Sequence, residues 1–284
     1  MLAYLVIGIF SGAAYGLLAV AFVMVYKGTR IFNLAQGEIG GVGLYVAWAL
    51  LHFLPVWAAV LVGVAVSALV GLAMERTLVR RLIDRTPLAA LAATLGAGLA
   101  LAYGEAILWG FNIKTFPSPF GTRIFHVGSI TMTSARIAAL VVAGLVAIGL
   151  GIFLRRTRFG LAVWAATSDQ VLARLSGVPV GRTRAFIWIL GGALSGISAI
   201  LLAAVYTFHP LSNTLILVRA LAAALLGGLT SLPGAFIGGL VVGIVESVAI
   251  SRTSTGGVVD LAIFMVILLT LLLRPQGLLG TKEA

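Results

Sequence analysis

The feature that most restricts this chain is a series of long apolar runs with almost no charge in them. Of its 284 residues, 61% are hydrophobic and 10% are charged, and a soluble domain of this length cannot bury so much apolar surface. Each run has about 20 residues, enough to cross the hydrocarbon core of a bilayer as a helix. Because the backbone in that core must satisfy its own hydrogen bonds, each crossing is expected to be helical. A β-barrel is disfavoured, since its strands would alternate in hydrophobicity.

The sequence therefore predicts an all-α, polytopic transmembrane helical bundle that forms one domain, residues 1–284, with about 8–10 membrane segments. Glycine and polar residues interrupt the apolar pattern at 34–43 and at 211–233, so either stretch is alternatively a half-helix or a re-entrant segment. The nine spans that we expect lie at residues 2–26, 34–54, 56–74, 88–111, 134–154, 185–206, 211–230, 234–250 and 258–273.

Two loops are strongly basic and predict the orientation of the chain. The loop at 75–86 has four arginines, and the loop at 155–184 has six arginines and one acid, Asp169. The positive-inside rule places both loops in the cytoplasm. With nine crossings the C-terminus, which carries Arg274 and Lys282, is then cytoplasmic and the N-terminus is external. Orientation and anionic headgroups account for the net charge of +11 better than nucleic acid does.

The loop at 155–184 has room for one short helix, about 161–175, between Gly160 and Gly177. A short exposed helix pinned at both ends is suited to docking a soluble motor and moving with it as a unit. The alternative is a solvated basic loop that only fixes the topology. On the external side the longest loop, 112–133, is the best candidate for contact with something outside the membrane.

Several chemistries are disfavoured by composition and spacing. Cysteine is absent and the three histidines are scattered, so neither a disulfide nor a metal site is expected. No Ser/His/Asp arrangement or pair of catalytic carboxylates can be assembled, and we predict no catalytic residue. The phosphate-loop pattern Gly-x-x-x-x-Gly-Lys-Ser/Thr is also missing, so this chain is not expected to be an ATPase.

Small residues recur at helical spacing in the first span. Gly8, Gly12 and Gly16 form one smooth stripe, and such stripes let membrane helices approach closely. Ordinary packing within one subunit is the first interpretation, and a subunit–subunit interface is the alternative.

Polar and glycine-rich interruptions occur in both halves of the chain, and matched broken segments indicate a transport pathway. We predict a pathway or gate at Asn33, Gln36, Gly37, Glu38, Gly227, Gly228, Ser231 and Pro233. Arg219 and Glu246 are costly charges within apolar segments and are expected to pair across adjacent helices, unless they are snorkelling side chains. Glu105 is a further intramembrane acid, with no specific role predicted.

Four motifs follow one another along the chain. They are Asn33-Leu34-Ala35-Gln36-Gly37-Glu38 with Gly40-Gly41; Thr157-x-x-Gly160 to Gly177; Leu226-Gly227-Gly228-Leu229-x-Ser231-x-Pro233-Gly234-Ala235 to Glu246; and Leu273-Arg274-Pro275-Gln276-Gly277. Together, in this order, they resemble the branched-chain amino-acid ABC transporter permeases of the LivH type. The resemblance covers most of the chain, with one departure: Trp164 stands where the family's loop usually carries arginine.

The resemblance implies a type II-like ABC importer permease in a bacterial or archaeal plasma (inner) membrane, surrounded by lipids. Its partners would be a second permease, related but different, two ABC ATPase subunits and a soluble substrate-binding protein. No cofactor is expected on this chain, since ATP and Mg²⁺ would bind the ATPases. The residues expected to couple to the ATPases are Arg158, Gly160, Ala165, Ala166, Asp169, Ala173 and Gly177.

Branched-chain or other hydrophobic amino acids are the cargo that the resemblance favours. The same superfamily also carries urea, short amides and aromatic acids, so these cargoes stay open. A different class, an ion-coupled secondary transporter that works alone, is the main rival. The arginine-rich loop argues against that rival.

Overall fold

The computed structural model describes residues 2–82, 85–121, 123–127, 130–252, 256–274 and 276–280. Pro275 and Lys282, which the sequence analysis uses, lie outside this described part. Each of the nine predicted spans coincides with one helix of the described part, which confirms the helical membrane bundle. These helices are α1 (Leu2–Thr29), α2 (Gln36–Leu50), α3 (Val56–Met74), α5 (Pro87–Trp109), α6 (Ser134–Arg156), α9 (Val180–Ala203), α10 (Ser212–Gly227), α11 (Leu232–Arg252) and α12 (Gly256–Leu273).

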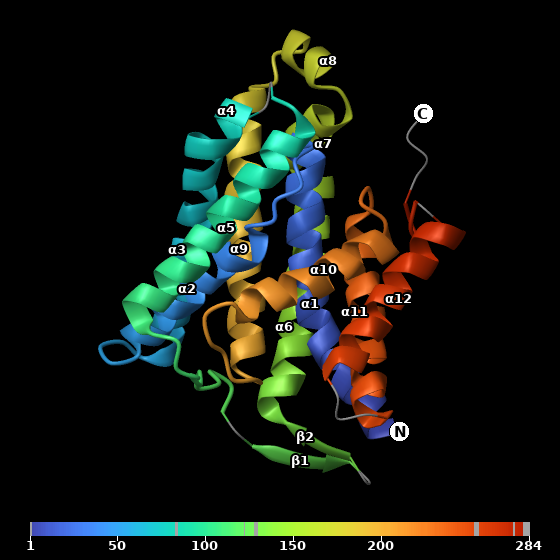
Figure 1. The fold of residues 1–284 in the computed structure, drawn as a ribbon. Coiled ribbons are helices and arrows are strands. Elements are labelled where there is room, and N and C mark those ends of the chain that lie inside the picture. Colours follow the sequence, from blue (N-terminus) through green and yellow to red (C-terminus); the bar gives the residue numbers. More distant parts are fainter. Residues whose placement is uncertain are drawn as a thin grey trace.

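Six stretches of the described chain are long and apolar enough to cross a membrane. They contain α1, α3, α5, α6, α9 and α11. In contrast, α2 has 15 residues and α10 has 16, so each is only about 22–24 Å long against a core of about 30 Å. These are the two stretches that the sequence marked as interrupted. Figure 1 shows α10 lying across the bundle rather than along it.

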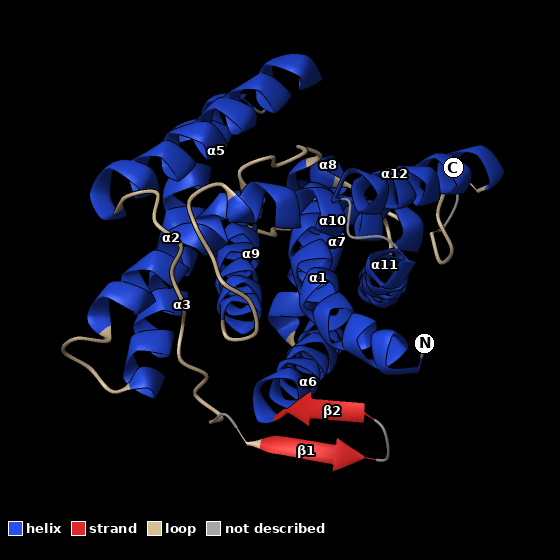
Figure 2. Ribbon diagram, turned by 60° about the horizontal axis from the view of Figure 1, so that its bottom comes forward, coloured by secondary structure: helices blue, strands red, loops and turns tan. Residues whose placement is uncertain are grey.

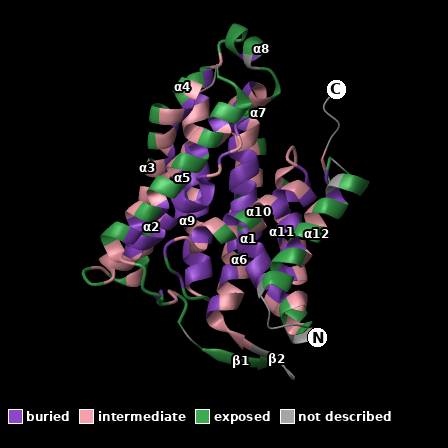
Figure 3. Ribbon diagram, in the orientation of Figure 1, coloured by how far each residue is buried: buried purple, intermediate pink, exposed green. Residues whose placement is uncertain are grey.

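The centre of the bundle is α1, which α9 and α11 cover (Figure 3). All residues from Ala13 to Val25 are buried. The glycine stripe of α1 packs on α11: a Cβ on Gly8 would lie 2.6 Å from the Gly243 carbonyl oxygen, and one on Gly12 would lie 2.7 Å from that of Gly239. The stripe is therefore a packing surface within one subunit, as its first interpretation predicted.

The outer helices turn apolar side chains outward, as a lipid-facing surface requires. Examples are Leu61 on α3, Ile107 on α5, Leu145 on α6 and Leu272 on α12, each more than 60% exposed. The buried residues lie toward the middle of the bundle (Figure 3). This distribution is the reverse of that in a soluble protein and agrees with a membrane location.

The two basic loops lie at the same end of the molecule, and α1 begins at the opposite end (Figure 1). One loop contains a π-helical turn, Glu75–Val79, and α4 (Arg80–Leu82). The fully buried Glu75 carboxylate accepts hydrogen bonds from Arg80 at 3.1 Å and from Arg184 at 2.8 Å. This ion pair ties the loop after α3 to the first turn of α9.

The second basic loop differs from the single helix that was predicted. It contains two short helices, α7 (Arg158–Ser168) and α8 (Gln170–Leu175). The backbone of Asp169 is extended, and its carboxylate accepts hydrogen bonds from the Val171 and Leu172 amides at 2.7 and 2.9 Å. Asp169 therefore ends α7 and caps α8, because a carboxylate at an N-cap satisfies amides that would otherwise be unpaired.

The loop at 112–133, which the sequence predicts to be external, is not entirely irregular. It contains an antiparallel hairpin of β1 (Ile124–Val127) and β2 (Ile130–Thr133), with Ile124 opposite Thr133 (Figure 2). Hydrophobic periodicity did not predict these strands, and an isolated antiparallel bridge also joins Lys114 to Phe208. The hairpin lies at the end of the molecule where α6 begins.

Candidate functional site

The chain turns back into the bundle between α1 and α2. Arg30 has a positive φ of 57°, and α2 begins beside the middle of α9 rather than at a membrane surface. The Gln36 amide donates to the Gly191 carbonyl at 3.0 Å and to the Ser195 hydroxyl at 2.7 Å. Asn33 donates to Gln36 at 2.6 Å. The first turn of α2 is thus a buried polar point inside the bundle.

The same point is reached by the start of α10. The Thr214 hydroxyl donates a hydrogen bond to Glu38 Oε1. Gly37 lets the backbones of the two helices approach, since a Cβ there would collide with the Asn213 carbonyl oxygen. Glu38 and Asn213 are each 2% exposed. Two short helices therefore meet through their amino-terminal turns, whose unpaired amides and dipoles favour polar and anionic groups.

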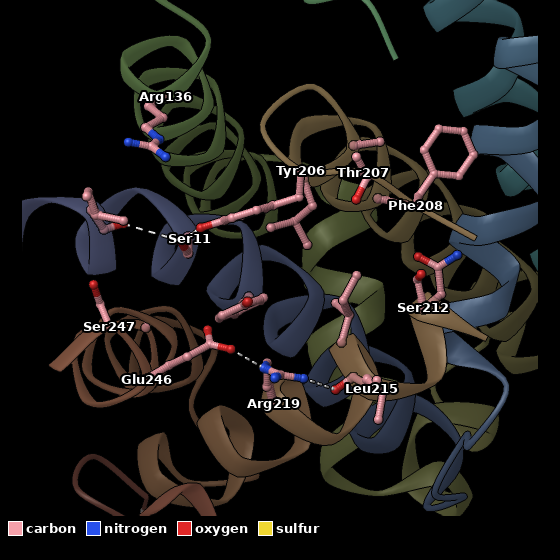
Figure 4. Close-up of a pocket in the computed structure, with 18 of the residues that line it drawn as sticks. Ser11, Arg136, Tyr206, Thr207, Phe208, Ser212, Leu215, Arg219, Glu246 and Ser247 are labelled. Carbon is pink, nitrogen blue, oxygen red and sulfur yellow. Dashed lines mark hydrogen bonds and ion pairs between the residues drawn. The ribbon is translucent and has the colours of Figure 1, made fainter. Parts of the chain in front are cut away.

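A cavity of about 400 Å³ opens beside this meeting point (Figure 4). Asn213 and Ser212 lie at its inner wall, and Ser11 and Tyr206 are joined by a hydrogen bond of 2.7 Å on another wall. Most of the remaining surface is apolar. Its apolar lining includes Ile7, Leu44, Leu202, Leu215 and Ile216. A cavity with apolar walls and a few fixed polar groups is the usual form of a small-molecule site.

The two predicted partners Arg219 and Glu246 lie side by side in this cavity. The Nε group of Arg219 donates to Glu246 Oε1, and the Asp260 carboxylate lies 3.7 Å from the guanidinium. Figure 4 shows Arg219 and Glu246 facing each other from α10 and α11. The guanidinium also donates to the Leu215 carbonyl at 3.2 Å. Pairing at this depth reduces the cost of holding charge near the membrane interior.

The other four predicted pathway residues lie elsewhere. Gly227, Gly228, Ser231 and Pro233 form the turn between α10 and α11. Asn213 lies about 21 Å away at the other end of α10. The turn packs against residues 276–280, and Lys27 donates to the Thr230 carbonyl at 3.0 Å. The two interrupted segments therefore meet at the start of α10, whereas the glycine-rich turn at its end lies apart from Asn33, Gln36, Gly37 and Glu38.

The turn is instead close to the predicted coupling loop. Ser231 and Pro233 line a second cavity, of about 830 Å³, together with Gly160, Trp164 and the end of α6. Gly160 lies inside α7, where a Cβ would collide with the Leu154 backbone. This cavity therefore lies between α7 and the start of α11.

The remaining coupling residues hold the shape of the loop. Ala166 and Ala173 are buried against Val180, while Gly177 has a φ of 79°, which favours glycine. Arg158 is the first residue of α7, and Ala165 lies in its second half. Trp164, Val171 and Leu175 are 66–79% exposed. Exposed apolar groups at the end of a membrane bundle mark an interaction surface.

Sequence reasoning missed Asn213 and Thr214, named Gly41 only as part of a motif, and assigned no role to Glu105. All lie near the start of α2. Nothing in the spacing of Asn213 and Thr214, which lie about 175 residues further along the chain, connects them to Glu38. A polar pair at the beginning of an apolar segment was the available signal, but it is not specific.

A membrane bundle with two helices too short to cross the hydrocarbon core, and a cavity beside the point where they meet, has the architecture of a membrane transport protein. The chain belongs to the family described as the branched-chain amino acid transport system permease component, whose model matches residues 4–273. This result confirms the resemblance and with it the permease interpretation.

Curated relatives support the same family. The chain is 30% identical to the high-affinity branched-chain amino acid transport system permease protein LivH of Salmonella typhimurium, over 97% of this chain and 94% of that protein. It is 33% identical to the LivH protein of Methanocaldococcus jannaschii, over 93% and 88%. Among solved structures, the PsaBC complex of Streptococcus pneumoniae has a similar fold, with a TM-score of 0.53 and 14% identity over 95% of this chain and 91% of that one.

Proposed function

We propose that this chain is one transmembrane subunit of an ATP-driven ABC importer for branched-chain or other hydrophobic amino acids. The observation that carries the proposal is the cavity of about 400 Å³ beside the meeting point of α2 and α10. Its apolar walls suit an aliphatic side chain, and its few polar groups suit the charged ends of an amino acid. Membership of the permease family supports the choice of cargo.

In this proposal the exposed face of α7 and α8 docks an ATPase subunit at the cytoplasmic end of the bundle. Closure of the ATPases would move α7, and its contacts with α6 and α9 would pass that motion into the bundle. A soluble binding protein would deliver cargo at the opposite end, where α1 begins. ATP and Mg²⁺ would bind the ATPases, and a second permease would complete the pathway.

Transport by the reconstituted assembly tests this proposal. Proteoliposomes containing this chain, a second permease, the ATPases and the binding protein should accumulate labelled leucine only when ATP reaches the ATPases. Competition by isoleucine and valine, but not by urea, acetamide or benzoate, would establish the cargo class. Uptake by this chain alone, driven by an ion gradient without ATP, would instead establish a secondary transporter.

A pair of matched variants tests the cavity itself. Leu215 lines the cavity and is 54% exposed, whereas Leu61 is 70% exposed on the outer face of α3. Leu215→Trp should block uptake while Leu61→Trp should leave it unchanged, because only the first adds bulk to the passage. Equal uptake in both variants would place the passage elsewhere.

A further inference from the structure

The start of α2 contains an unusual concentration of buried polar atoms without partners. Seven buried side-chain nitrogen or oxygen atoms in the described chain make no hydrogen bond, and four of them belong to Glu38, Glu105 and Asn213. They are Glu38 Oε2, Glu105 Oε1, Glu105 Oε2 and Asn213 Nδ2. A fifth, the Tyr45 hydroxyl, lies one helical turn beyond Gly41 on α2. Such groups are costly to bury without a partner.

Three of these atoms converge on one small hollow. A Cβ on Gly41 would lie 2.5 Å from Asn213 Nδ2, 2.6 Å from Glu105 Oε1 and 3.2 Å from Glu38 Oε2. Because glycine has no Cβ, these three polar groups can lie this close to the backbone of α2, and the hollow is the space beside Gly41 that they share. The three side chains come from α10, α5 and α2, so the hollow is a tertiary feature of three helices. Asn213 is 98% buried, and its unpartnered amide group points into the hollow.

The hollow carries more negative charge than its surroundings compensate. Glu38 lies in the first turn of α2, where the helix dipole favours a carboxylate, and it also accepts the Thr214 hydrogen bond. Glu105 lies in the last turns of α5, where the dipole disfavours a negative charge. It is 1% exposed, and neither of its oxygens has a partner. Glu105 Oε1 and Glu38 Oε2 both lie within 3.2 Å of one point. Two ionised carboxylates that lie so close repel strongly in a medium of low dielectric constant.

The basic side chain at this end of the α2–α5 interface is engaged elsewhere. The Lys114 ammonium donates to the Trp109 carbonyl at 2.9 Å and to the Asn112 carbonyl at 3.3 Å. It also lies over the rings of Trp48 and Tyr45, at 5.1 and 5.9 Å from their centroids. The groups that face the hollow are thus the two acids, the Asn213 amide and the Thr214 hydroxyl, with Tyr45 one turn away.

We propose that the hollow over Gly41 is a binding site for one small monovalent cation, Na⁺ or a proton, held by Glu38, Glu105 and Asn213. One positive charge balances the carboxylate that the helices leave uncompensated. Hard cations prefer oxygen ligands, and rotation of the Asn213 amide turns its oxygen to the site. A divalent ion is disfavoured, because Ca²⁺ needs six to eight oxygens and Mg²⁺ retains several waters.

The cavity supplies a route to this site. Asn213 faces the hollow and also lines the cavity of about 400 Å³, so the site and the cavity are adjacent at this side chain. Asn213 therefore separates the site from the cavity in this conformation. The inference needs no particular cargo, and its failure would leave the importer proposal intact.

Thermal stability of the purified full-length chain in lipid nanodiscs tests the site without measuring transport. Tryptophan fluorescence would report Tm in choline chloride and in sodium chloride at equal ionic strength, at pH 8 and pH 6. The variants are the double isostere Glu38→Gln with Glu105→Gln, and Gly41→Ala, which fills the hollow. Gly104→Ala is the matched control, because it neighbours Glu105 and its Cβ would meet nothing within 4 Å.

A bound Na⁺ predicts that sodium raises the wild-type Tm at pH 8 by at least about 2 °C relative to choline. A bound proton predicts that the wild-type Tm in choline rises by at least about 2 °C when the pH is lowered from 8 to 6. Either rise should disappear in the double isostere and in Gly41→Ala and persist in Gly104→Ala. If the double isostere responds to sodium and to pH as the wild type does, the site does not exist.

Discussion

The start of α2 and the turn between α10 and α11 are both glycine-rich in the sequence, but their glycines have different neighbours in the structure. At the start of α2, Gly41 leaves room for side-chain oxygens and an amide from three helices. At the turn between α10 and α11, Gly227 and Gly234 bring backbone against backbone. The first region is buried and polar and lies beside the central cavity. The second is a packed turn next to α7. A glycine-rich stretch in the sequence therefore does not by itself identify a pathway. The groups that lie beside each glycine distinguish a polar site from a packed turn.

The largest effect is expected at the turn. In Gly227→Val a side chain would have to occupy the space of the Gly234 backbone, which cannot move as a flexible side chain can. We expect a loss of stability of about 3 kcal/mol or more, measured as a fall in Tm and in the monodisperse yield. Gly104→Ala, with open space beside it, is the control. A stable Gly227→Val chain would mean that the turn is not tightly packed.

A second variant separates the turn from the coupling helix. Gly160→Leu places a side chain of α7 against the Leu154 backbone of α6, so it should tilt α7 and weaken its packing on α6. We expect ATP hydrolysis to continue while leucine uptake falls about tenfold, a loss of about 1.4 kcal/mol of coupling. Gly181→Leu is the control, because a Cβ at Gly181 would meet nothing within 4 Å. Normal uptake by Gly160→Leu would contradict a coupling role for α7.

The polar region should respond in transport more than in folding. Glu38→Ala removes the acceptor of the Thr214 hydroxyl and the charge at the start of α2. Because this buried carboxylate lies beside the cavity, uptake should fall by about tenfold, which corresponds to about 1.4 kcal/mol. Uptake is measured per unit of chain in the membrane, with expression as the control. Unchanged uptake would make Glu38 a structural residue.

The smallest effect is expected for Thr214→Val, which removes one hydroxyl and keeps the shape of the side chain. Glu38 Oε1 would lose its donor, and we expect a loss of stability of about 1 kcal/mol. In the double variant with Glu38→Ala the two losses should not add, because they remove the same hydrogen bond. Fully additive losses in Tm would show that the Thr214–Glu38 contact is absent in the membrane.

The sequence predicted the membrane bundle well, because apolar length is a local property. Each of the nine spans contains a helix, and 34–43 and 211–233 coincide with the two short helices. The candidate site was predicted only in part. Asn33, Gln36 and Glu38 are polar residues inside an apolar region and are visible without any partner. Gly227 lies at the other end of α10, because the likeness of two glycine-rich stretches in sequence does not determine where each one packs.

Local chemistry also decided one detail that spacing alone missed. A helix of about 161–175 was expected, yet Asp169 divides it into α7 and α8 by capping the second. An aspartate competes with the helix for backbone amides, and this preference was stronger than the continuous apolar pattern. The hairpin of β1 and β2 was missed for a related reason, since short strands at a loop carry little periodicity.

By itself the sequence determined that this chain crosses a membrane as helices and that its basic loops lie at one end. Those properties follow from transfer of apolar residues to lipid and from the distribution of charge, and neither needs a contact map. Only the tertiary structure decided that Glu105, Asn213 and Thr214 meet Glu38 over Gly41. They come from three helices far apart in the chain, and only close packing of those helices brings their polar atoms into one hollow.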